Sequence, residues 1–370
     1  MHRAQPPGTR RTDDSAGAGW RIGRHRRPRA RRRPGARRRV VAVAVVALLS
    51  VVAAAGWLLH RLDGNLETVD IDSALGSDRP AAGPDGALNI LVLGSDSRAG
   101  SNGRYGRDHG GSRSDTAMVV HLSKDRTRAD VVSVPRDTMV DRPACRQSDG
   151  TTAPARRGMF NEALSTGGPA CAVKTVEAMS SVRMDHFVEI DFHGFTQVID
   201  VLGGVDITTT RPIHDPYSHL DLPAGSHHLD GEKALGLVRT RHGVGDGSDL
   251  GRIEVQQSFL KALSRQARSS GALSNPSELY RLADITTRNI TTDETLGSVQ
   301  QLVGLARRVK DVDTRRLATV TLPVSPDPAD PNRVVPDTRR AAAMWSALGA
   351  DRPLPRPERP GGGRTGSVVR

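Results

Sequence analysis

An early part of the chain predicts a small sheet. Residues 88–94 form the largely apolar run L-N-I-L-V-L-G, which ends in glycine and is typical of a strand buried on both faces. Residues 116–122 and 129–134 predict two more strands, joined by the polar, turn-forming stretch 123–128. So short a connection makes these two strands an antiparallel hairpin. If the first strand runs parallel to the third, the polar residues at their ends gather at one end of the sheet.

The rest of the chain alternates between strand and helix patterns. Strands are expected at 186–192, 205–209 and 317–323, and helices at 159–164, 170–179, 193–202, 230–238, 249–268, 275–290, 295–309 and 338–348. Such alternation favours an α/β fold, in which helices flank one mixed sheet. Aromatic residues make up only 3% of the chain, so the core must consist mainly of aliphatic side chains.

Residues 40–59 contain no charge and predict a transmembrane helix. At 1.5 Å per residue, twenty residues span a hydrocarbon core of about 30 Å. A cleaved signal peptide is the alternative, but the run is long for one and no clear A-x-A cleavage site follows it. We therefore expect a retained anchor, a stalk or linker at 60–86, a folded domain at 87–350 and a disordered, Pro-, Gly- and Arg-rich tail at 351–370.

The positive charge of the chain is concentrated before this helix. Residues 1–39 hold fourteen arginines and two aspartates, which account for the whole net charge of +12. The positive-inside rule then places this arm in the cytoplasm and the domain outside the cell membrane. Binding of the arm to DNA is a second possibility, but membrane topology and anionic lipid explain its position more simply.

Cys145 and Cys171 are the only cysteines, and both fall on the expected outer side. An even pair in an oxidising compartment is compatible with a disulfide, and two free thiols are the alternative. Two cysteines alone do not form a metal site. The histidines show none of the spacings of zinc ligands, and the chain has no phosphate-binding P-loop and no nucleophile elbow.

Charged residues follow or precede the three early strands. Asp96 and Arg98 follow the first strand, Arg113 and Asp115 precede the second, and Arg136 follows the third. Gathering these carboxylates and guanidinium groups is costly unless a metal ion and an anion lie between them. A surface cluster of salt bridges is the alternative. The Gly-rich stretch 99–112 is a candidate lid over this site.

A second group of polar residues lies further along the chain. Arg239 and Arg241 point to the same side if their segment is extended. In the helix at 249–268, the core-facing stripe begins with Asp249, Arg252 and Gln256 and continues with apolar residues, whereas Gln257 lies opposite. Inward polar groups need partners, and a phosphate is a suitable one. An ordinary ion pair between Asp249 and Arg252 is the alternative.

Several motifs together resemble the LytR-CpsA-Psr family of cell-wall phosphotransferases. They are L-V-L-G-S-D-S-R at 91–98, R-S-D-T at 113–116, S-V-P-R-D-T at 133–138, D-F-x-G-F at 191–195 through G-G-V-D at 203–206, L-D-G-E-K-A-L at 229–235, V-R-x-R at 238–241 and D-x-G-R-x-x-x-Q-Q at 249–257. The resemblance implies a membrane-anchored enzyme that transfers a glycopolymer from a polyprenyl diphosphate carrier to peptidoglycan and forms a phosphodiester.

Carried over by motif, the resemblance also implies the roles of individual residues. Asp96 and Asp115 hold Mg²⁺, and an apolar tunnel holds the polyprenyl tail. The diphosphate-binding residues are Arg98, Arg113, Arg136, Arg239, Arg241, Arg252 and Gln256. The catalytic residues are Asp115, Arg136, Asp249 and Arg252, with Asp249 as the candidate general base and Asp115 as its alternative.

Two features depart from the family pattern. The 99–112 loop is longer and richer in glycine than is usual in the family, and residues 310–370 match no part of the family pattern. Two other functions stay open. A membrane-anchored pyrophosphatase uses the same residues with water as the acceptor, and a transcriptional regulator binds DNA through the Arg-rich arm.

Overall fold

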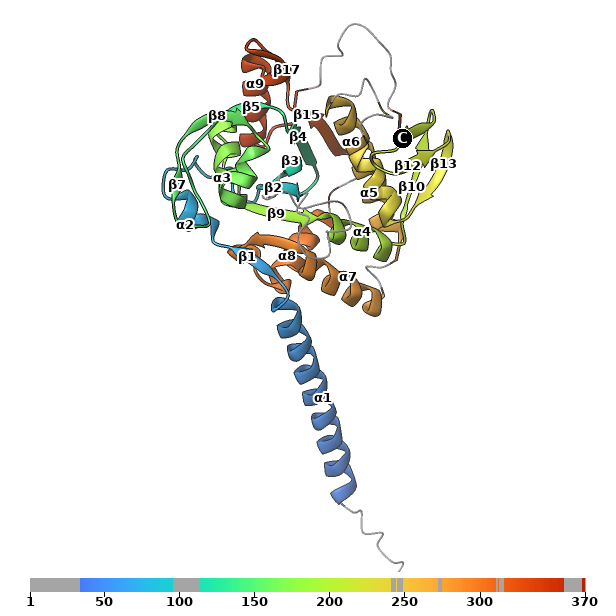
Figure 1. The fold of residues 1–370 in the computed structure, drawn as a ribbon. Coiled ribbons are helices and arrows are strands. Elements are labelled where there is room, and N and C mark those ends of the chain that lie inside the picture. Colours follow the sequence, from blue (N-terminus) through green and yellow to red (C-terminus); the bar gives the residue numbers. More distant parts are fainter. Residues whose placement is uncertain are drawn as a thin grey trace, which may run out of the picture. The chain divides into compact units, whose positions relative to one another are not determined.

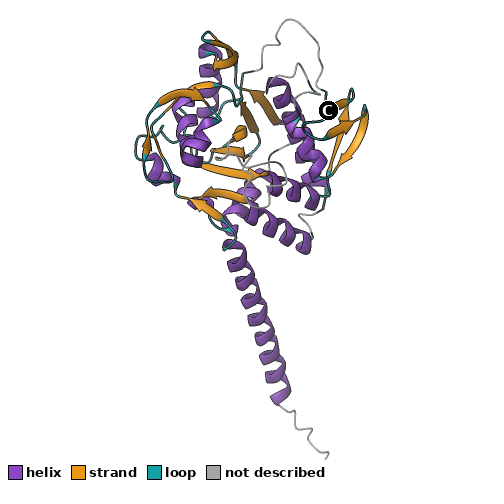
Figure 2. Cartoon of the chain, in the orientation of Figure 1, coloured by secondary structure: helices purple, strands orange, loops and turns teal. Residues whose placement is uncertain are grey.

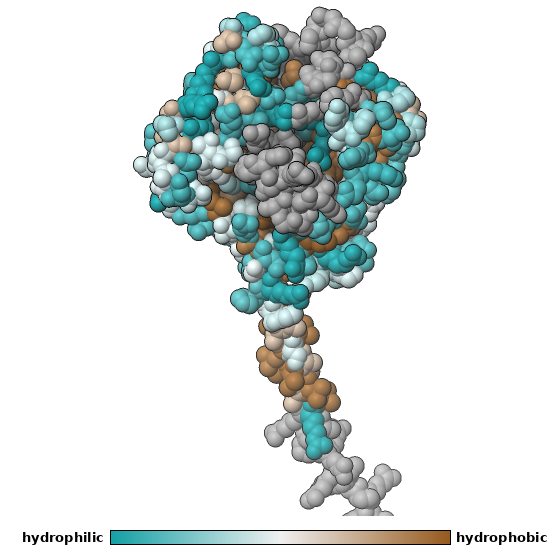
Figure 3. Space-filling view, viewed as in Figure 1, coloured by the Kyte–Doolittle hydropathy of each residue, from teal (hydrophilic) through white to brown (hydrophobic). Residues whose placement is uncertain are grey.

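The computed structural model forms two compact units, residues 1–54 and 55–370. It describes residues 34–95, 114–240, 244, 249–271, 275–310, 312, 316–355 and 368–369. Helix α1 (Pro34–Asp63) begins in the first unit and ends in the second. Within the described part of the chain, α1 alone is long and apolar enough to cross a membrane, over Arg39–Asp63 with a mean hydropathy of 2.5. Its apolar length is brown in Figure 3.

A seven-stranded mixed sheet forms the centre of the second unit, in the order β1-β14-β9-β2-β3-β4-β15 (Figure 1). These strands are β1 (Glu67–Val69), β2 (Leu88–Ser95), β3 (Ser114–Leu122), β4 (Ala129–Val134), β9 (His186–Asp191), β14 (Ile290–Asp293) and β15 (Leu317–Thr321). The pairs β2–β9, β4–β15 and β1–β14 are parallel, and the other three are antiparallel. The predicted mixed sheet with flanking helices is confirmed.

The predicted hairpin has the expected register. Leu122 pairs with Ala129 beside the turn, and Ala117 pairs with Val134 at the other end of the hairpin. Strand β2 is also antiparallel to β3, so β2 and β4 run in the same direction. The end of β2, the start of β3 and the end of β4 therefore lie at one end of the sheet, as the sequence predicted.

Helices cover both faces of the sheet because its strands alternate their side chains between the two faces (Figure 2). On β2, Leu91 and Leu93 belong to the main core, which includes buried residues of α3 (Glu162–Ser180) and α9 (Thr338–Gly349). Val92 and Gly94 face a cavity that residues of α6 also line. Helix α6 (Asp249–Ser269) packs on β10 and β15.

A second, smaller core lies beyond α6 and contains buried residues such as Ile199, Val205, Leu229 and Phe259. Its elements are α4 (Phe192–Val201), β10 (Val205–Thr209), β11 (Ile213–Asp215), β12 (Leu220–Leu222), β13 (Gly225–Leu229) and α5 (Gly231–Arg239). The remaining elements are α2 (Ile71–Leu75), β5 (Met139–Arg142), β6 (Cys145–Arg146), β7 (Thr152–Ala153), β8 (Arg156–Met159), α7 (Pro276–Asn289), η2 (Glu294–Leu296), α8 (Val299–Lys310), β16 (Val324–Asp327) and β17 (Asp330–Pro336).

Cys145 of β6 and Cys171 of α3 form a disulfide, with their Cα atoms 5.5 Å apart. The two helices expected at 159–164 and 170–179 are one element, α3, with a kink at Gly167 and Gly168. A Cβ atom on Gly167 would lie 2.7 Å from the carbonyl oxygen of Arg146. Glycine therefore permits the close approach of α3 to β6 at the disulfide.

The stretch 60–86, expected to be a stalk or linker, is partly folded into the domain. Glu67–Val69 form the edge strand β1, Asp70 caps α2, and Leu62 is buried. Arg79 forms an ion pair of 2.7 Å with the buried Glu177 of α3. The polar residues that suggested a linker are thus caps and ion-pair partners.

The expected tail is also partly packed against the domain. The Asp351 side chain lies 3.0 Å from His121 and 2.8 Å from Arg128, and both contacts are largely buried. Val368 and Val369 belong to the second core. The expectation of a tail that begins at 351 is therefore wrong for these residues, and residues 356–367 and 370 lie outside the described part.

Candidate functional site

The structure describes about half of the predicted site residues. Asp96, Arg98, Arg113 and Arg241 lie outside the described residues, as does the 99–112 loop. The backbone of Asp115 belongs to β3, but its side chain is outside the described part. The side chains that are described are those of Arg136, Arg239, Asp249, Arg252 and Gln256.

Arg136 and Arg252 meet at Asp249, so two groups that are far apart in the sequence form one cluster. Arg136 follows β4, and its backbone N–H donates to Asp249 Oδ2 at 3.2 Å. Its guanidinium Nε lies 3.8 Å from Asp249 Oδ1. The guanidinium group of Arg252, one turn along α6, forms an ion pair with the same Oδ1. The carboxylate of Asp249 therefore contacts both arginines, and Asp137 Oδ2 lies 3.6 Å from the Nε of Arg136.

The environment of this cluster is largely dry. The side chains of Arg252 and Asp249 are 3% and 14% exposed, and that of Arg136 is 22% exposed. Two carboxylates, those of Asp137 and Asp249, thus approach the two arginines. The planar guanidinium group binds phosphate and carboxylate oxygens in pairs, so an anion with several oxygens is a suitable additional ligand.

Gln256 joins three elements at the cavity. Its side-chain NH₂ group donates to Thr116 Oγ1 at 3.1 Å and to the carbonyl oxygen of Val238 at 3.0 Å. Thr116 follows Asp115 on β3, and Val238 precedes Arg239 on α5. Gln256 therefore ties the start of β3 and the end of α5 to α6.

The neighbouring Gln257 does not lie away from the core, as the helical stripe had predicted. Its side-chain NH₂ group donates to Ser133 Oγ at 3.3 Å and to Thr321 Oγ1 at 3.2 Å, on β4 and β15. Helix α6 is partly wrapped by the sheet and the second core, so more of its circumference is covered than a single stripe.

Arg239 is the last residue of α5 and lies over the ring of Phe192. Its guanidinium carbon is 4.6 Å from the ring centroid, which is within the range of a cation–π interaction. The condition that the segment from Arg239 is extended is met at Thr240 but not at Arg239, because the helix continues to Arg239. The following Thr240 is buried and donates to Asp215 Oδ2 at 2.8 Å.

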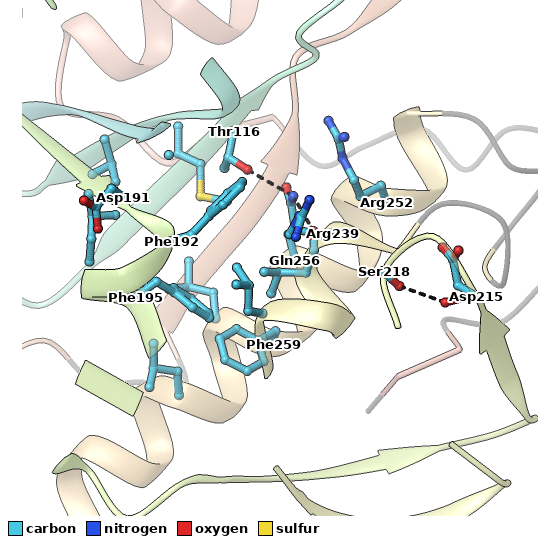
Figure 4. A pocket seen from close by; sticks show the side chains of 18 of the residues that line it. Thr116, Asp191, Phe192, Phe195, Asp215, Ser218, Arg239, Arg252, Gln256 and Phe259 are labelled. Carbon is cyan, nitrogen blue, oxygen red and sulfur yellow. Dashed lines mark hydrogen bonds between the residues drawn. The ribbon is translucent and has the colours of Figure 1, made fainter. Parts of the chain in front are cut away.

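An apolar cavity of about 370 Å³ lies between the sheet and helices α4, α5 and α6. Figure 4 shows Phe192, Phe195 and Phe259 on one side of it and Thr116, Gln256 and Arg239 close together at another. The further lining residues are Val92, Gly94, Met118, Ile190, Asp191, Asp215, Tyr217, Ser218, Leu235, Val238, Arg252, Leu260 and Leu263. The cavity thus has aliphatic and aromatic walls and arginine side chains among its few polar groups.

The sequence predicted an apolar tunnel but not the individual residues that line it. The signal that could have found Phe192 and Phe195 is the D-F-x-G-F stretch, in which Asp191 caps α4 by accepting from the Gly194 N–H at 2.7 Å. The cap sets the direction of α4 and thereby the position of both rings.

Glu189 is a further acidic residue beside the end of β2. Burial raises the pKa of Glu189, a hydrogen bond with Ser95 opposes this change, and the carboxylates of Glu67 and Asp191 raise the pKa further. Glu189 pairs with Leu93, and Asp191 pairs with Ser95. Its burial depends on three strands that are distant in sequence, so the pattern of residues gave no signal for it.

The model of the LytR_cpsA_psr family matches residues 59–349. The chain belongs to the LytR_cpsA_psr family. The matched region contains the anchor end, the sheet, the arginine cluster and the cavity. The resemblance expected from the motifs is confirmed, and the match also includes residues 310–349, which were expected to match nothing.

Curated relatives and solved structures agree with this membership. The cell wall biosynthesis protein LcpA of Corynebacterium glutamicum is 32% identical over 268 residues, which cover 65% of this chain and 51% of the relative. The polyisoprenyl-teichoic acid–peptidoglycan teichoic acid transferase TagV of Bacillus subtilis is 30% identical over 247 residues, which cover 65% of this chain and 59% of TagV. The chain spans about half the length of the first of these relatives.

The solved structures show the same fold. The TagV crystal structure matches with a TM-score of 0.56 and 26% identity, covering 73% of this chain and 99% of TagV. The LytR-Csp2A-Psr enzyme from Actinomyces oris also matches with a TM-score of 0.56, at 24% identity, covering 77% of this chain and 96% of that enzyme.

The magnesium site expected for a LytR_cpsA_psr member stays a prediction. The side chains of both expected ligands, Asp96 and Asp115, lie outside the described residues. Among the side chains that the structure describes, three or more His, Cys, Asp or Glu residues do not gather into a metal-binding group. The pairs His214–Asp221 and His228–Asp206 are exposed contacts of two residues each.

Proposed function

We propose that this protein transfers a glycopolymer from a polyprenyl diphosphate carrier to peptidoglycan. The observation that carries this proposal is the cavity, whose lining is mostly apolar and includes Arg239 and Arg252 among its polar side chains. A carrier with a hydrocarbon tail and a diphosphate group has the matching distribution of polarity. The name of the relative TagV, a polyisoprenyl-teichoic acid–peptidoglycan transferase, supports the same substrate class.

The size of the cavity sets how much of the tail it holds. Ligand pockets commonly have volumes of about 300–1,000 Å³, and this cavity of about 370 Å³ is near the lower limit. It therefore accommodates a part of a long polyprenyl chain, and the remainder extends outside. The diphosphate then lies at the arginine end of the cavity.

The proposed reaction is a displacement at the phosphorus atom that carries the polymer. The hydroxyl oxygen of a peptidoglycan sugar forms a bond to this phosphorus, and the bond from phosphorus to the bridging oxygen breaks. Polyprenyl monophosphate leaves with the electrons of that bond, and the hydroxyl proton passes to a base. Polymer and peptidoglycan are then joined by a phosphodiester.

The arginines contribute by offsetting the charge on the phosphate oxygens. Arg136 and Arg252 are held in place by Asp249 before substrate binds, so little reorganisation is needed. Both oxygens of Asp249 contact these two residues, which supports a positioning role for it. The base is therefore Asp249 after rearrangement or Asp115, and Arg98, Arg113 and Arg241 add further positive charge.

Mg²⁺ is proposed as the cofactor, with the carboxylates of Asp96 and Asp115 as the hard oxygen ligands that it prefers. When bound, it neutralises diphosphate charge and polarises the phosphorus–oxygen bonds. The arginines orient the same group in a site from which the apolar walls exclude water.

The position of the anchor supports action on a membrane-bound carrier. A row of paired residues crosses the sheet from β1 to β2. Glu67, at the start of β1, pairs with Thr291 of β14, and Thr291 pairs with Glu189 of β9. Glu189 in turn pairs with Leu93 near the end of β2. Three strand spacings of about 4.8 Å place Glu67 roughly 14 Å from Leu93. The chain thus enters the sheet from the anchor at the end where the site lies. With the Arg-rich arm in the cytoplasm, the domain that carries the site is on the outer side of the membrane.

The variant Arg136→Lys tests the role of the arginine cluster. Lysine keeps the charge but loses the planar fork that binds two oxygens, so we expect transfer to fall roughly ten- to a hundredfold, from a loss of about 1.5–3 kcal/mol. The matched control is Arg157→Lys, because Arg157 pairs with Asp327 at 3.0 Å and its side chain is 48% exposed. Unchanged transfer by both variants would assign the cluster to structure alone.

A pyrophosphatase reaction on the same carrier differs from transfer in whether product release needs an acceptor. A transferase releases polyprenyl monophosphate only when a peptidoglycan acceptor is present, whereas a pyrophosphatase releases it with water alone. Thin-layer analysis of the released lipid, with and without acceptor, distinguishes the two reactions.

A further inference from the structure

We propose that helices α7 and α8 form a lipid-docking face that binds the anionic membrane surface beside the anchor. The face comprises the exposed side chains of Val303 and Arg307, which lie one turn apart on α8, and of Leu279 on α7. The proposal rests on the membrane anchor of the proposed function.

The end of α1 holds both helices close to the membrane boundary. Asp63 Oδ1 accepts from the backbone N–H of Val299, the first residue of α8, at 2.7 Å. Asn65 Nδ2 donates to Asp284 Oδ1 and Thr287 Oγ1 of α7 at 3.2 and 3.4 Å. All of these residues belong to the same compact unit.

The distance along the chain from the membrane is short. The expected span ends at Leu59, and Asp63 follows four residues later on the same helix, which is about 6 Å at 1.5 Å per residue. Trp57 is 61% exposed, and the guanidinium carbon of Arg61 lies 5.8 Å from its ring centroid. An aromatic residue beside a basic one is typical of the membrane–water interface. The start of α8 is therefore within about one helical turn of this interface.

Exposed apolar residues are concentrated on these helices. Outside α1, the described part of the chain has five large hydrophobic residues with substantial exposure. Leu279, Val303 and Val309 lie on α7 and α8, with exposures of 46%, 42% and 46%. The other two, Tyr217 and Leu250, are a lining residue of the cavity and the neighbour of Asp249. Figure 3 shows that most of the visible face of the domain is hydrophilic.

The charge of α8 favours an anionic lipid surface over a second protein chain as the occupant. Its sequence contains Arg307, Arg308 and Lys310 and no acidic residue. Basic helices with an exposed apolar side bind at the headgroup level of anionic bilayers. A second copy of this chain would instead bring two such cationic helices together, which is unfavourable.

Docking of this face has a consequence for the reaction. A single anchor leaves a domain free to tilt, whereas two further contacts beside it restrict the orientation. The site at the end of β2 is then held at a constant height above the bilayer that contains the carrier.

The test uses the full chain with one added cysteine that carries an environment-sensitive nitrobenzoxadiazole fluorophore. Both native cysteines are in the disulfide, so the added one is labelled selectively. The probe site is Val303→Cys, the positive control is Leu49→Cys within the span, and the negative control is Arg339→Cys, exposed on α9. The protein is reconstituted in vesicles of phosphatidylcholine and phosphatidylglycerol that contain a lipid spin-labelled near the headgroup.

We expect the fluorophore at position 303 to be quenched several-fold more than that at position 339. Two changes should reduce the quenching at position 303. One is the double variant Arg307→Glu with Arg308→Glu, and the other is the use of vesicles made of phosphatidylcholine alone. Equal quenching at 303 and 339, with position 49 quenched, overturns the docking face but leaves the anchor and the proposed transfer intact. Absence of quenching at position 49 overturns the anchor as well.

Two more results bear on the occupant of the face. Quenching at 303 that is unchanged when each vesicle holds a single chain supports a lipid contact. The alternative is a second copy of the chain over the face. In that case the fluorophore at 303 is shielded from water but not quenched by the spin-labelled lipid, and it becomes exposed when each vesicle holds a single chain. This result overturns the proposal.

Discussion

Gln256 and Gln257 are adjacent, of the same type, and each donates two side-chain hydrogen bonds, but only Gln256 contacts the cavity. We predict that Gln256→Leu and Gln257→Leu lose similar stability and differ in activity. Each variant loses two hydrogen bonds worth about 1 kcal/mol each, so its free energy of unfolding should fall by about 2 kcal/mol. This loss is measured by urea denaturation of the wild type and both variants.

The expected loss of activity follows from what Gln256 holds in place. Without its bonds to Thr116 and to the Val238 carbonyl oxygen, the start of β3 and the end of α5 lose their common support. Asp115 and Arg239 adjoin these two points. We therefore expect Gln256→Leu to lose about 1.4 kcal/mol of transition-state stabilisation, which is a tenfold fall in kcat/KM. Gln257 contacts β4 and β15 and does not line the cavity, so Gln257→Leu should retain activity close to that of the wild type.

The assay is release of polyprenyl monophosphate from a polymer-linked carrier in the presence of an acceptor, at a temperature where both variants are folded. Equal loss of kcat/KM in the two variants would show that Gln256 acts through stability alone. Full activity of Gln256→Leu would show that the two hydrogen bonds do not support the site.

Three further predictions concern the disulfide, a buried acid and the metal. Replacing Cys145 and Cys171 by serine should lower the free energy of unfolding by about 3–4 kcal/mol, because the bond closes a loop with a sequence separation of 26; an unchanged urea midpoint contradicts this. The pKa of Glu189 is raised by burial, so the folded state loses stability as the pH rises from the unfolded pKa through the folded one. Glu189→Gln should therefore stabilise the protein at pH 7 but not near pH 4, and a gain independent of pH would refute the assignment. Chelation should stop transfer and Mg²⁺ should restore it steeply in the wild type but poorly in Asp115→Asn; transfer that persists in the chelator excludes the metal.

The sheet and its hairpin were predictable because each depends on local pattern. The apolar run of β2 and the six-residue turn between β3 and β4 leave few possible registers, and these place Arg136 at the correct end. The polar start of α6 was informative for the same reason, since helical geometry sets which of its residues share a face.

Features that depend on contacts between distant segments were not predictable. Strand β1 has only three residues and two of them are polar, so only its pairing with β14 identifies it as a strand. The contact of Arg239 with Phe192 depends on the packing of α5 against α4. Gln257 looked solvent-facing because the helical pattern does not reveal how far the sheet wraps around α6.

The proposed transfer is tested most directly by following the phosphorus atom that it moves. The carrier is prepared with ³²P in the phosphate next to the polymer, and the purified full chain in vesicles is incubated with peptidoglycan fragments. The proposal predicts that the label becomes covalently bound to the peptidoglycan fragment in a phosphodiester, with one unlabelled polyprenyl monophosphate released for each transfer. Label recovered as free polymer phosphate, or remaining on the lipid, would contradict it.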